Sequence, residues 1–142
     1  SLFVFFAYSL ESDNKEKSPS TFTYAGGKAK VFRDLTGDNR KTDSYIVAYI
    51  SESGSLGLSI GDQSIKRSEF NARTDCRRKA RDMDSCVKLL EEKARCFAAS
   101  QGWVGISYVA IGNSDASSIG DFSLNACERS NKACRLLTES CI

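Results

Sequence analysis

The spacing of apolar residues in the first half of the chain predicts strands joined by short turns. Between residues 21 and 31, apolar and polar positions alternate around a glycine-containing turn at 25–27, which predicts a hairpin. The continuous apolar run Tyr45–Ile50 is typical of a central strand that is buried on both faces. After the polar residues 52–55 the alternation resumes over 56–60, so we predict a second hairpin.

After the second hairpin the apolar spacing becomes that of a helix. Ile65, Ala72, Cys76 and Ala80 share one face of the predicted helix, and Ser64 is suited to cap its first turn. The opposite face carries the basic residues Lys66, Arg67, Arg73, Arg77, Arg78 and Arg81. This face could contact an acidic protein partner or anionic lipid headgroups. Acidic neighbours nearly cancel its charge, which favours an ordinary solvated helix surface over a docking site.

The second half of the chain echoes this order of predicted elements. Residues 103–111 have the alternation of a strand, residues 112–113 can turn, and apolar residues over 119–126 follow helical spacing. Trp103 and Tyr108 lie within the predicted strand, where an aromatic side chain belongs more often to the core than to a surface that stacks on a sugar or a partner. We therefore expect both rings to be buried.

Two short segments add to the echo between the halves. Ser59–Ser64 and Ser118–Ser123 agree in five of six positions, and they contain Asp62 and Asp121 respectively. Two carboxylates related by duplication could flank a substrate, as in glycoside hydrolysis. An aspartate that follows glycine at a helix start is more simply a cap or a partner of the helix dipole. The pair is therefore only a candidate catalytic site.

Length and composition indicate one globular domain. The chain has 142 residues, of which 41% are hydrophobic and 27% are charged. A net charge of +2 is too small to predict nucleic-acid binding, and no apolar stretch approaches the length of a membrane-spanning helix. The polar loop 34–43 holds three aspartates, but their spacing misses the ligand pattern of a helix-loop-helix calcium site. We expect no metal and no cofactor.

The N-terminal residues differ from the rest of the chain. Residues 1–9 are strongly apolar and end in small residues spaced as at a signal-peptidase site, so they are either the end of a signal peptide or a first strand. Residues 10–20 are polar and contain the single proline, which is typical of a linker. We assign 1–20 to a signal-peptide remnant with a polar linker and 21–142 to a single disulfide-rich α+β domain.

Cysteine and histidine content carry the strongest compositional signal. The cysteines all lie in the second half of the chain, at Cys76, Cys86, Cys96, Cys127, Cys134 and Cys141. They are typical of a disulfide framework in a secreted or periplasmic protein, and no C-x-x-C pair indicates structural zinc. Six cysteines allow fifteen pairings, which these residues alone leave open. Histidine is absent, so the usual side chain for acid–base catalysis near neutral pH is missing.

A family resemblance appears when these residues are combined. The motif Gly57-x-Ser59-x-Gly61-x-x-Ser64, the cysteine spacing and Phe97-Ala98-Ala99 resemble the secreted bacterial domain-of-unknown-function family four-one-eight-nine over about residues 45–142. The resemblance implies a six-cysteine domain of two pseudo-repeats, export, and contact with a host or competitor, but no reaction. It also implies that residues 86–90 begin a strand, although residues 88–94 are rich in strong helix formers. The first hairpin lies outside the match, and residues 117–120 stand where the family has an alanine-rich helix. The pseudo-repeat suggests pairing Cys76 with Cys86, Cys127 with Cys134, and Cys96 with Cys141.

Together these observations predict an α+β fold. We expect an antiparallel sheet with two helices packed on one side, built from two pseudo-repeated strand-hairpin-helix-strand halves and stabilised by disulfides. The predicted function is a secreted, noncatalytic binding module that contacts a protein partner as an effector, inhibitor or immunity protein. Its candidate contact residues are Arg67, Arg73, Arg77, Arg78 and Arg81. The alternative is a hydrolase of envelope polymers that uses Asp62 and Asp121, and the oligomeric state stays open.

Overall fold

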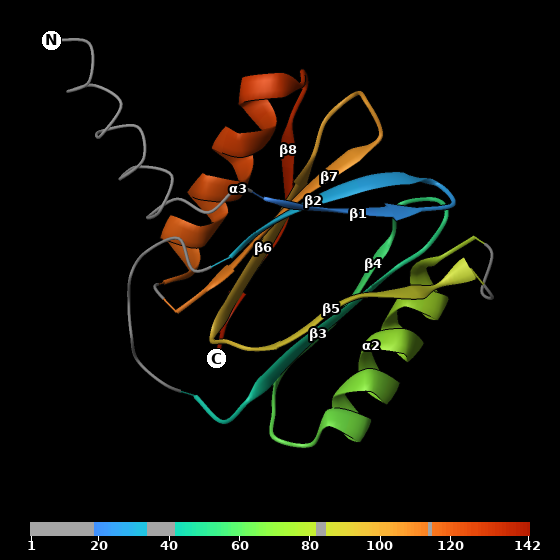
Figure 1. Cartoon of the computed structure of the whole chain (residues 1–142), viewed down its shortest axis with the longest axis vertical. Helices are drawn as coiled ribbons and strands as arrows, with labels where there is room; N and C mark the ends of the chain where they lie inside the picture. The colour runs from blue at the N-terminus through green and yellow to red at the C-terminus, as the bar shows by residue number, and fades with distance from the viewer. Residues whose placement is uncertain (1–18, 34–41, 82–84, 114) are drawn as a thin grey trace, which may run out of the picture.

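The computed structural model describes residues 19–33, 42–81, 85–113 and 115–142 of the chain. The predicted signal-peptide remnant, most of the linker and most of the polar loop 34–43 lie outside the described residues. In the described part, the chain forms eight strands and two helices, which are arranged as two β-sheets between two helical layers (Figure 1).

The larger sheet is mixed and has the strand order β1-β2-β7-β6-β8. Its strands are β1 (Ser20–Tyr24), β2 (Gly27–Arg33), β6 (Cys96–Gln101), β7 (Ile106–Gly112) and β8 (Arg135–Cys141). Strands β2 and β7 run parallel, whereas the other neighbouring pairs are antiparallel. The smaller sheet is antiparallel and has the order β4-β3-β5. Its strands are β3 (Tyr45–Ile50), β4 (Leu56–Asp62) and β5 (Val87–Lys93).

The two helices cover different sheets. Helix α2 (Ile65–Lys79) packs against β3 and β4 of the smaller sheet, and α3 (Ala116–Ser130) packs against β6, β7 and β8 of the larger one. Figure 1 shows α2 and α3 on opposite sides of the molecule, with both sheets between them. The layers therefore follow the order α2, smaller sheet, larger sheet, α3.

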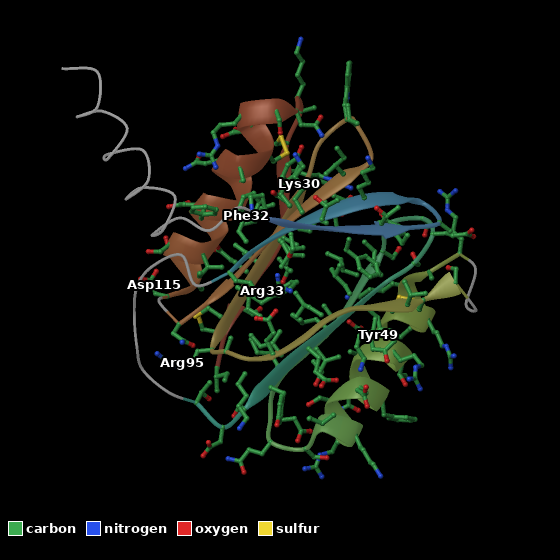
Figure 2. All side chains as sticks on the ribbon, viewed as in Figure 1. Lys30, Phe32, Arg33, Tyr49, Arg95 and Asp115 are labelled. Atoms are coloured by element: carbon green, nitrogen blue, oxygen red, sulfur yellow. A yellow bond between two sulfur atoms is a disulfide. The ribbon has the colours of Figure 1, made fainter. Side chains whose placement is uncertain are left out.

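The main hydrophobic core lies between the two sheets. Ile46, Ala48 and Ile50 of the central strand β3 face this core together with residues of β2, β6 and β7. The alternate residues Val47 and Tyr49 face α2 instead, and Figure 2 shows Tyr49 on the side of the smaller sheet that α2 covers. The strand is therefore buried on both faces, as its continuous apolar sequence predicts.

The predicted α+β class is confirmed, but the predicted arrangement of one sheet with two helices on one side is wrong. Strands β3 and β6 are apolar on both faces, so each sheet needs cover on both. The other sheet covers one face and a helix covers the other. The parallel pairing of β2 with β7 joins the first hairpin to the second half of the chain, a contact that no local sequence pattern indicates.

Two consecutive segments share one order of elements, β3-β4-α2-β5 and β6-β7-α3-β8. In each segment the first strand lies between the other two. The two matching hexapeptides nevertheless occupy different places. Residues 59–64 connect the end of β4 to the cap of α2, whereas residues 118–123 lie inside α3. Their match therefore does not make Asp62 and Asp121 structurally equivalent, and duplication of the two halves stays a prediction.

The glycine-containing motif after β3 docks α2 on the smaller sheet. A Cβ atom at Gly57 would lie 2.6 Å from the Cα of Cys76 and closer still to the backbone oxygen of Ala72, so strand and helix backbones are in contact. Gly61 is the extra residue of a β-bulge and has a φ of +92°, a conformation that favours glycine. Ser64 caps α2 as predicted, because its side chain accepts a hydrogen bond from a backbone N–H of the first turn.

The three disulfides have the pairing that the pseudo-repeat suggests. They are Cys76–Cys86, Cys96–Cys141 and Cys127–Cys134. Two of them join the last turn of a helix, α2 or α3, to the residue just before the strand that follows it, β5 or β8. The third joins residues that are register partners in β6 and β8. The disulfide framework therefore closes each helix–strand connection and ties the C-terminal strand into the larger sheet.

Candidate binding surface

A tryptophan projects into solvent from the connection between β6 and β7. Trp103 is 82% exposed and the neighbouring Val104 is 58% exposed, although both are large apolar residues. The prediction that Trp103 belongs to the core is wrong, because β7 begins at Ile106 and the tryptophan precedes the strand. Tyr108 is buried as predicted, and its hydroxyl lies 2.9 Å from the hydroxyl of Ser130.

The backbone of this connection, which we call the Trp103 loop (residues 102–105), is fixed by Asn131. The Nδ2 of Asn131 donates to the carbonyl of Val104 at 3.0 Å, and the Oδ1 accepts from the N–H of Val104 at 3.1 Å. The N–H of Trp103 also donates to the carbonyl of Lys132 at 2.9 Å. These bonds hold the backbone on both sides of the tryptophan ring, which itself stays exposed.

Asn131 is in turn positioned by a disulfide. It follows the end of α3 within the short segment that Cys127–Cys134 closes, and this segment also contains Ala133 with a φ of +55°. A Cβ atom at Gly102 would lie only 2.6 Å from the Cγ of Asn131, so the loop and this segment are in close contact. The disulfide therefore supports the position of Trp103 through Asn131. Prior ordering of a binding loop lowers the conformational entropy that binding costs.

No local pattern in the sequence predicts the contact between Asn131 and the Trp103 loop. Asn131 and Lys132 between two cysteines indicate a turn, but nothing in the local pattern connects that turn to Trp103, which lies far from it in sequence. One sequence feature does indicate that the strand begins after Trp103, namely Gly102, because glycine is typical of turns.

The predicted basic contact face on α2 is largely engaged within the molecule. The Nε of Arg67 donates to Oδ2 of Asp62 at 2.7 Å, and Arg73 donates to the hydroxyl of Tyr49 at 3.0 Å. The guanidinium of Arg73 also lies over the Tyr49 ring, 5.3 Å from its centre. Arg78 is paired with the carboxylate of Asp75 on the same helix. The two remaining candidates, Arg77 and Arg81, are exposed to solvent.

Asp62 and Asp121 lie in different layers of the fold. Asp62 ends β4 in the smaller sheet, where its carboxylate accepts from the N–H of Ser64 at 2.9 Å and from Arg67. The hydrogen bond from Arg67 lowers the pKa of Asp62, and the bond from Ser64 adds to this effect. Asp121 is exposed on α3, outside the larger sheet, and no hydrogen bond joins these two described residues. Asp62 therefore lies at a helix start as the sequence favours, where it binds the capping residue Ser64. The same interpretation is wrong for Asp121, which lies inside α3, a helix that is capped by Asp115.

Three comparisons with known proteins found no match to this chain. No family model, no curated protein and no solved structure matches the chain. The resemblance to the family named above therefore stays a prediction. In the described part of the chain, no group of three or more cysteine, aspartate and glutamate side chains is placed to hold a metal ion. Neither α2 nor α3 has the length and apolar character needed to cross a membrane.

Proposed function

We propose that this chain is a secreted, noncatalytic binding module that contacts a protein partner through the Trp103 loop. The observation that carries the proposal is a tryptophan that is 82% exposed on a loop whose backbone is held by Asn131, a residue of the segment that the disulfide Cys127–Cys134 closes. Single exposed apolar residues are common on protein surfaces. Trp103 differs from such residues because the backbone of its loop is held by the side chain of Asn131, which lies in a disulfide-closed segment.

The energetics of protein interfaces support this role. Tryptophan is enriched among the residues that dominate binding energy, and truncation of such a residue typically costs about 2 kcal/mol or more of binding free energy. A flexible loop would lose part of that gain to ordering, whereas the Trp103 loop is already ordered by its contacts with residues 131 and 132. An effector, an inhibitor and an immunity protein would each use such a site.

The proposed location is the extracellular space or the periplasm. Three disulfides in a domain of this size are typical of an oxidising compartment. We also propose that the two halves arose by duplication and that the chain belongs with the six-cysteine family it resembles. The shared order of a central first strand, a hairpin neighbour, a helix and a third strand supports that proposal.

The test is capture of a partner from the native host or a rival bacterium, followed by affinity measurements with the identified protein. We expect Trp103→Ala to weaken binding by about 30-fold or more, the equivalent of about 2 kcal/mol, without lowering the melting temperature. Phe70→Ala is the matched control, because Phe70 is an aromatic residue that is 65% exposed on α2.

Equal affinities of the wild type and Trp103→Ala would overturn the proposed contact. A loss confined to Phe70→Ala would move the interface to the basic face of α2. Turnover of an envelope polymer that disappears in Asp62→Asn or Asp121→Asn would instead support the hydrolase alternative.

A further inference from the structure

A cleft opens where the edge strand β4 of the smaller sheet faces the edge strand β8 of the larger sheet. It encloses about 500 Å³, which is within the size range of small-molecule sites. Its apolar wall is formed by Leu56 and Leu58 of β4, Phe97 of β6 and Leu137 of β8. We call this region the edge cleft. It is lined by residues of the turn 53–55 between β3 and β4 and by residues of α2, β4, β6 and β8, and it contains none of the Trp103 loop. The uncharged polar part of the lining comes from Ser53, Ser55, Gln101 and Thr138.

A bulge in β8 supplies several of the side chains that line the edge cleft. The register between β6 and β8 shifts at Ala99 and Ser100, which leaves Leu137 as an extra residue in β8. Leu137 and Thr138 consequently both line the cleft, although successive residues of a regular strand point to opposite faces. Arg135, from the start of the same strand, also lines it. Bulges that redirect side chains in this way are common beside binding sites.

The wall formed by α2 and β4 is closed by hydrogen bonds of its own. Asp75 accepts from the N–H of Leu58 at 3.1 Å and from Lys79 at 3.0 Å, and it is paired with Arg78. Lys79 also donates to the carbonyl of Leu56 at 3.3 Å. Burial alone would raise the pKa of Asp75, but the bonds from Leu58 and Lys79, together with the positive charges of Lys79 and Arg78, hold that pKa below its usual value.

The opposite wall carries Arg135, whose charge, unlike that of Lys79, is not paired with a carboxylate of the described residues. Arg135 forms no ion pair with any carboxylate in the described ranges of the chain. With Lys79 and Asp75 compensating each other, Arg135 leaves the lining of the edge cleft with a positive charge. A guanidinium presents several donors in a plane that matches a carboxylate. The cleft therefore combines an apolar wall with one unmatched positive charge.

We propose that the edge cleft binds a small monocarboxylate with an apolar body. The carboxylate accepts hydrogen bonds from Arg135, and the apolar body lies over Leu58 and Leu137. A ligand of this class uses both properties of the cleft. An uncharged apolar molecule would gain no charge-assisted hydrogen bond from Arg135, which is exposed to solvent, and a small hydrophilic anion would leave the leucines hydrated.

The hydrogen bonds on β4 favour this ligand over an extended peptide. A peptide that adds to an exposed sheet edge pairs with free backbone N–H and C=O groups. On the wall that faces the cleft, the N–H of Leu58 is bonded to Asp75 and the carbonyl of Leu56 to Lys79. Strand addition to β4 would have to break both of these bonds, whereas a small acid would leave them intact.

The experiment is an NMR titration of the full chain with three probes, namely decanoate, 1-decanol and acetate. We expect saturable shifts with decanoate in β4, β8 and the last turn of α2, and at least tenfold weaker binding of 1-decanol and acetate. Arg135→Gln should weaken the binding of decanoate at least tenfold. Arg77→Gln is the matched control, because it removes the same charge from an exposed position of α2 outside the cleft.

Leu137→Ala is the second variant. It should weaken the binding of decanoate although Arg135 is intact, because it removes part of the apolar wall. Equal affinities for 1-decanol and decanoate would overturn the role of the arginine. Shifts that map to the Trp103 loop, or the absence of saturation with decanoate, would overturn the site itself. Because Trp103→Ala leaves the cleft unchanged, failure of this proposal and failure of the proposed protein contact are distinguishable.

Discussion

Replacement of Gly57 by alanine tests how α2 is held on the smaller sheet. The added Cβ would lie 2.2 Å from the carbonyl oxygen of Ala72, whereas ordinary contacts begin at 3.4 Å, so strand and helix must separate by about 1.2 Å at this point. Backbone atoms of Ala72 and Cys76 surround this position, and no flexible side chain is available to move aside. The disulfide Cys76–Cys86 also restrains the helix at the point of contact.

These constraints put the expected cost at the upper end of the range for overpacked sites. We expect Gly57→Ala to lower the free energy of unfolding by about 3 kcal/mol, a large part of the total stability of a domain this size. Movement of α2 would also lengthen the hydrogen bond from the N–H of Leu58 to Asp75, which holds one wall of the edge cleft in place. The variant should therefore bind decanoate more weakly as well.

Urea denaturation followed by circular dichroism measures the change, with linear extrapolation to water. Gly105→Ala is the matched control, because a Cβ atom there meets no heavy atom within 4 Å. Alanine at such a site should be neutral or stabilise by about 0.5 kcal/mol by restricting the unfolded chain. A Gly57→Ala protein within about 1 kcal/mol of the wild type would refute the close contact between strand and helix backbones.

Two further predictions concern the disulfides and acid stability. The entropy of loop closure predicts that the two disulfides differ in their contribution to stability. Removing Cys96–Cys141, with a sequence separation of 45, by alanine at both positions should lower the free energy of unfolding by about 4 kcal/mol. Removing Cys127–Cys134, with a separation of 7, in the same way should lower it by about 2.5 kcal/mol. Urea denaturation of both double variants measures the order, and the reverse order would contradict the entropic account. The depressed pKa of Asp75 means that its stabilisation is complete above its usual value of 3.8 and is lost as the pH falls through the lower folded-state pKa. Asp75→Asn should therefore make the acid decline of the unfolding free energy shallower, and an unchanged decline would show that the carboxylate is not stabilised by folding.

Local sequence patterns were sufficient for most elements of this fold. The hairpin over 21–31, the buried strand Tyr45–Ile50 and the two helices were all predicted from the spacing of apolar residues. The cap at Ser64 was predicted from residue type and position alone. These features depend on contacts within a few residues, which the order of side chains along the chain encodes directly.

The candidate binding regions depend on contacts between distant segments. Trp103 is exposed because β7 starts later than its alternation indicates, and its loop is held by Asn131 from the far end of α3. The edge cleft combines α2 and β4 with β8 at the C-terminus, and it depends on a bulge at Leu137 that the sequence does not indicate. Neither arrangement has a local periodicity from which it could be predicted.

The sequence by itself determined the α+β class, the strands over 21–31, 45–50 and 56–60, the two helices and the presence of a disulfide framework, because side-chain type and spacing act over single elements. The positions of β6 and β8 were not predicted, and the strand after Cys86 was implied only by the family resemblance. The pairing of the cysteines followed only from the suggested pseudo-repeat. Tertiary structure alone decided the division into two sheets, the parallel pairing of β2 with β7 and the exposure of Trp103. Those outcomes depend on which apolar faces cover one another, and several partners would satisfy the same local pattern.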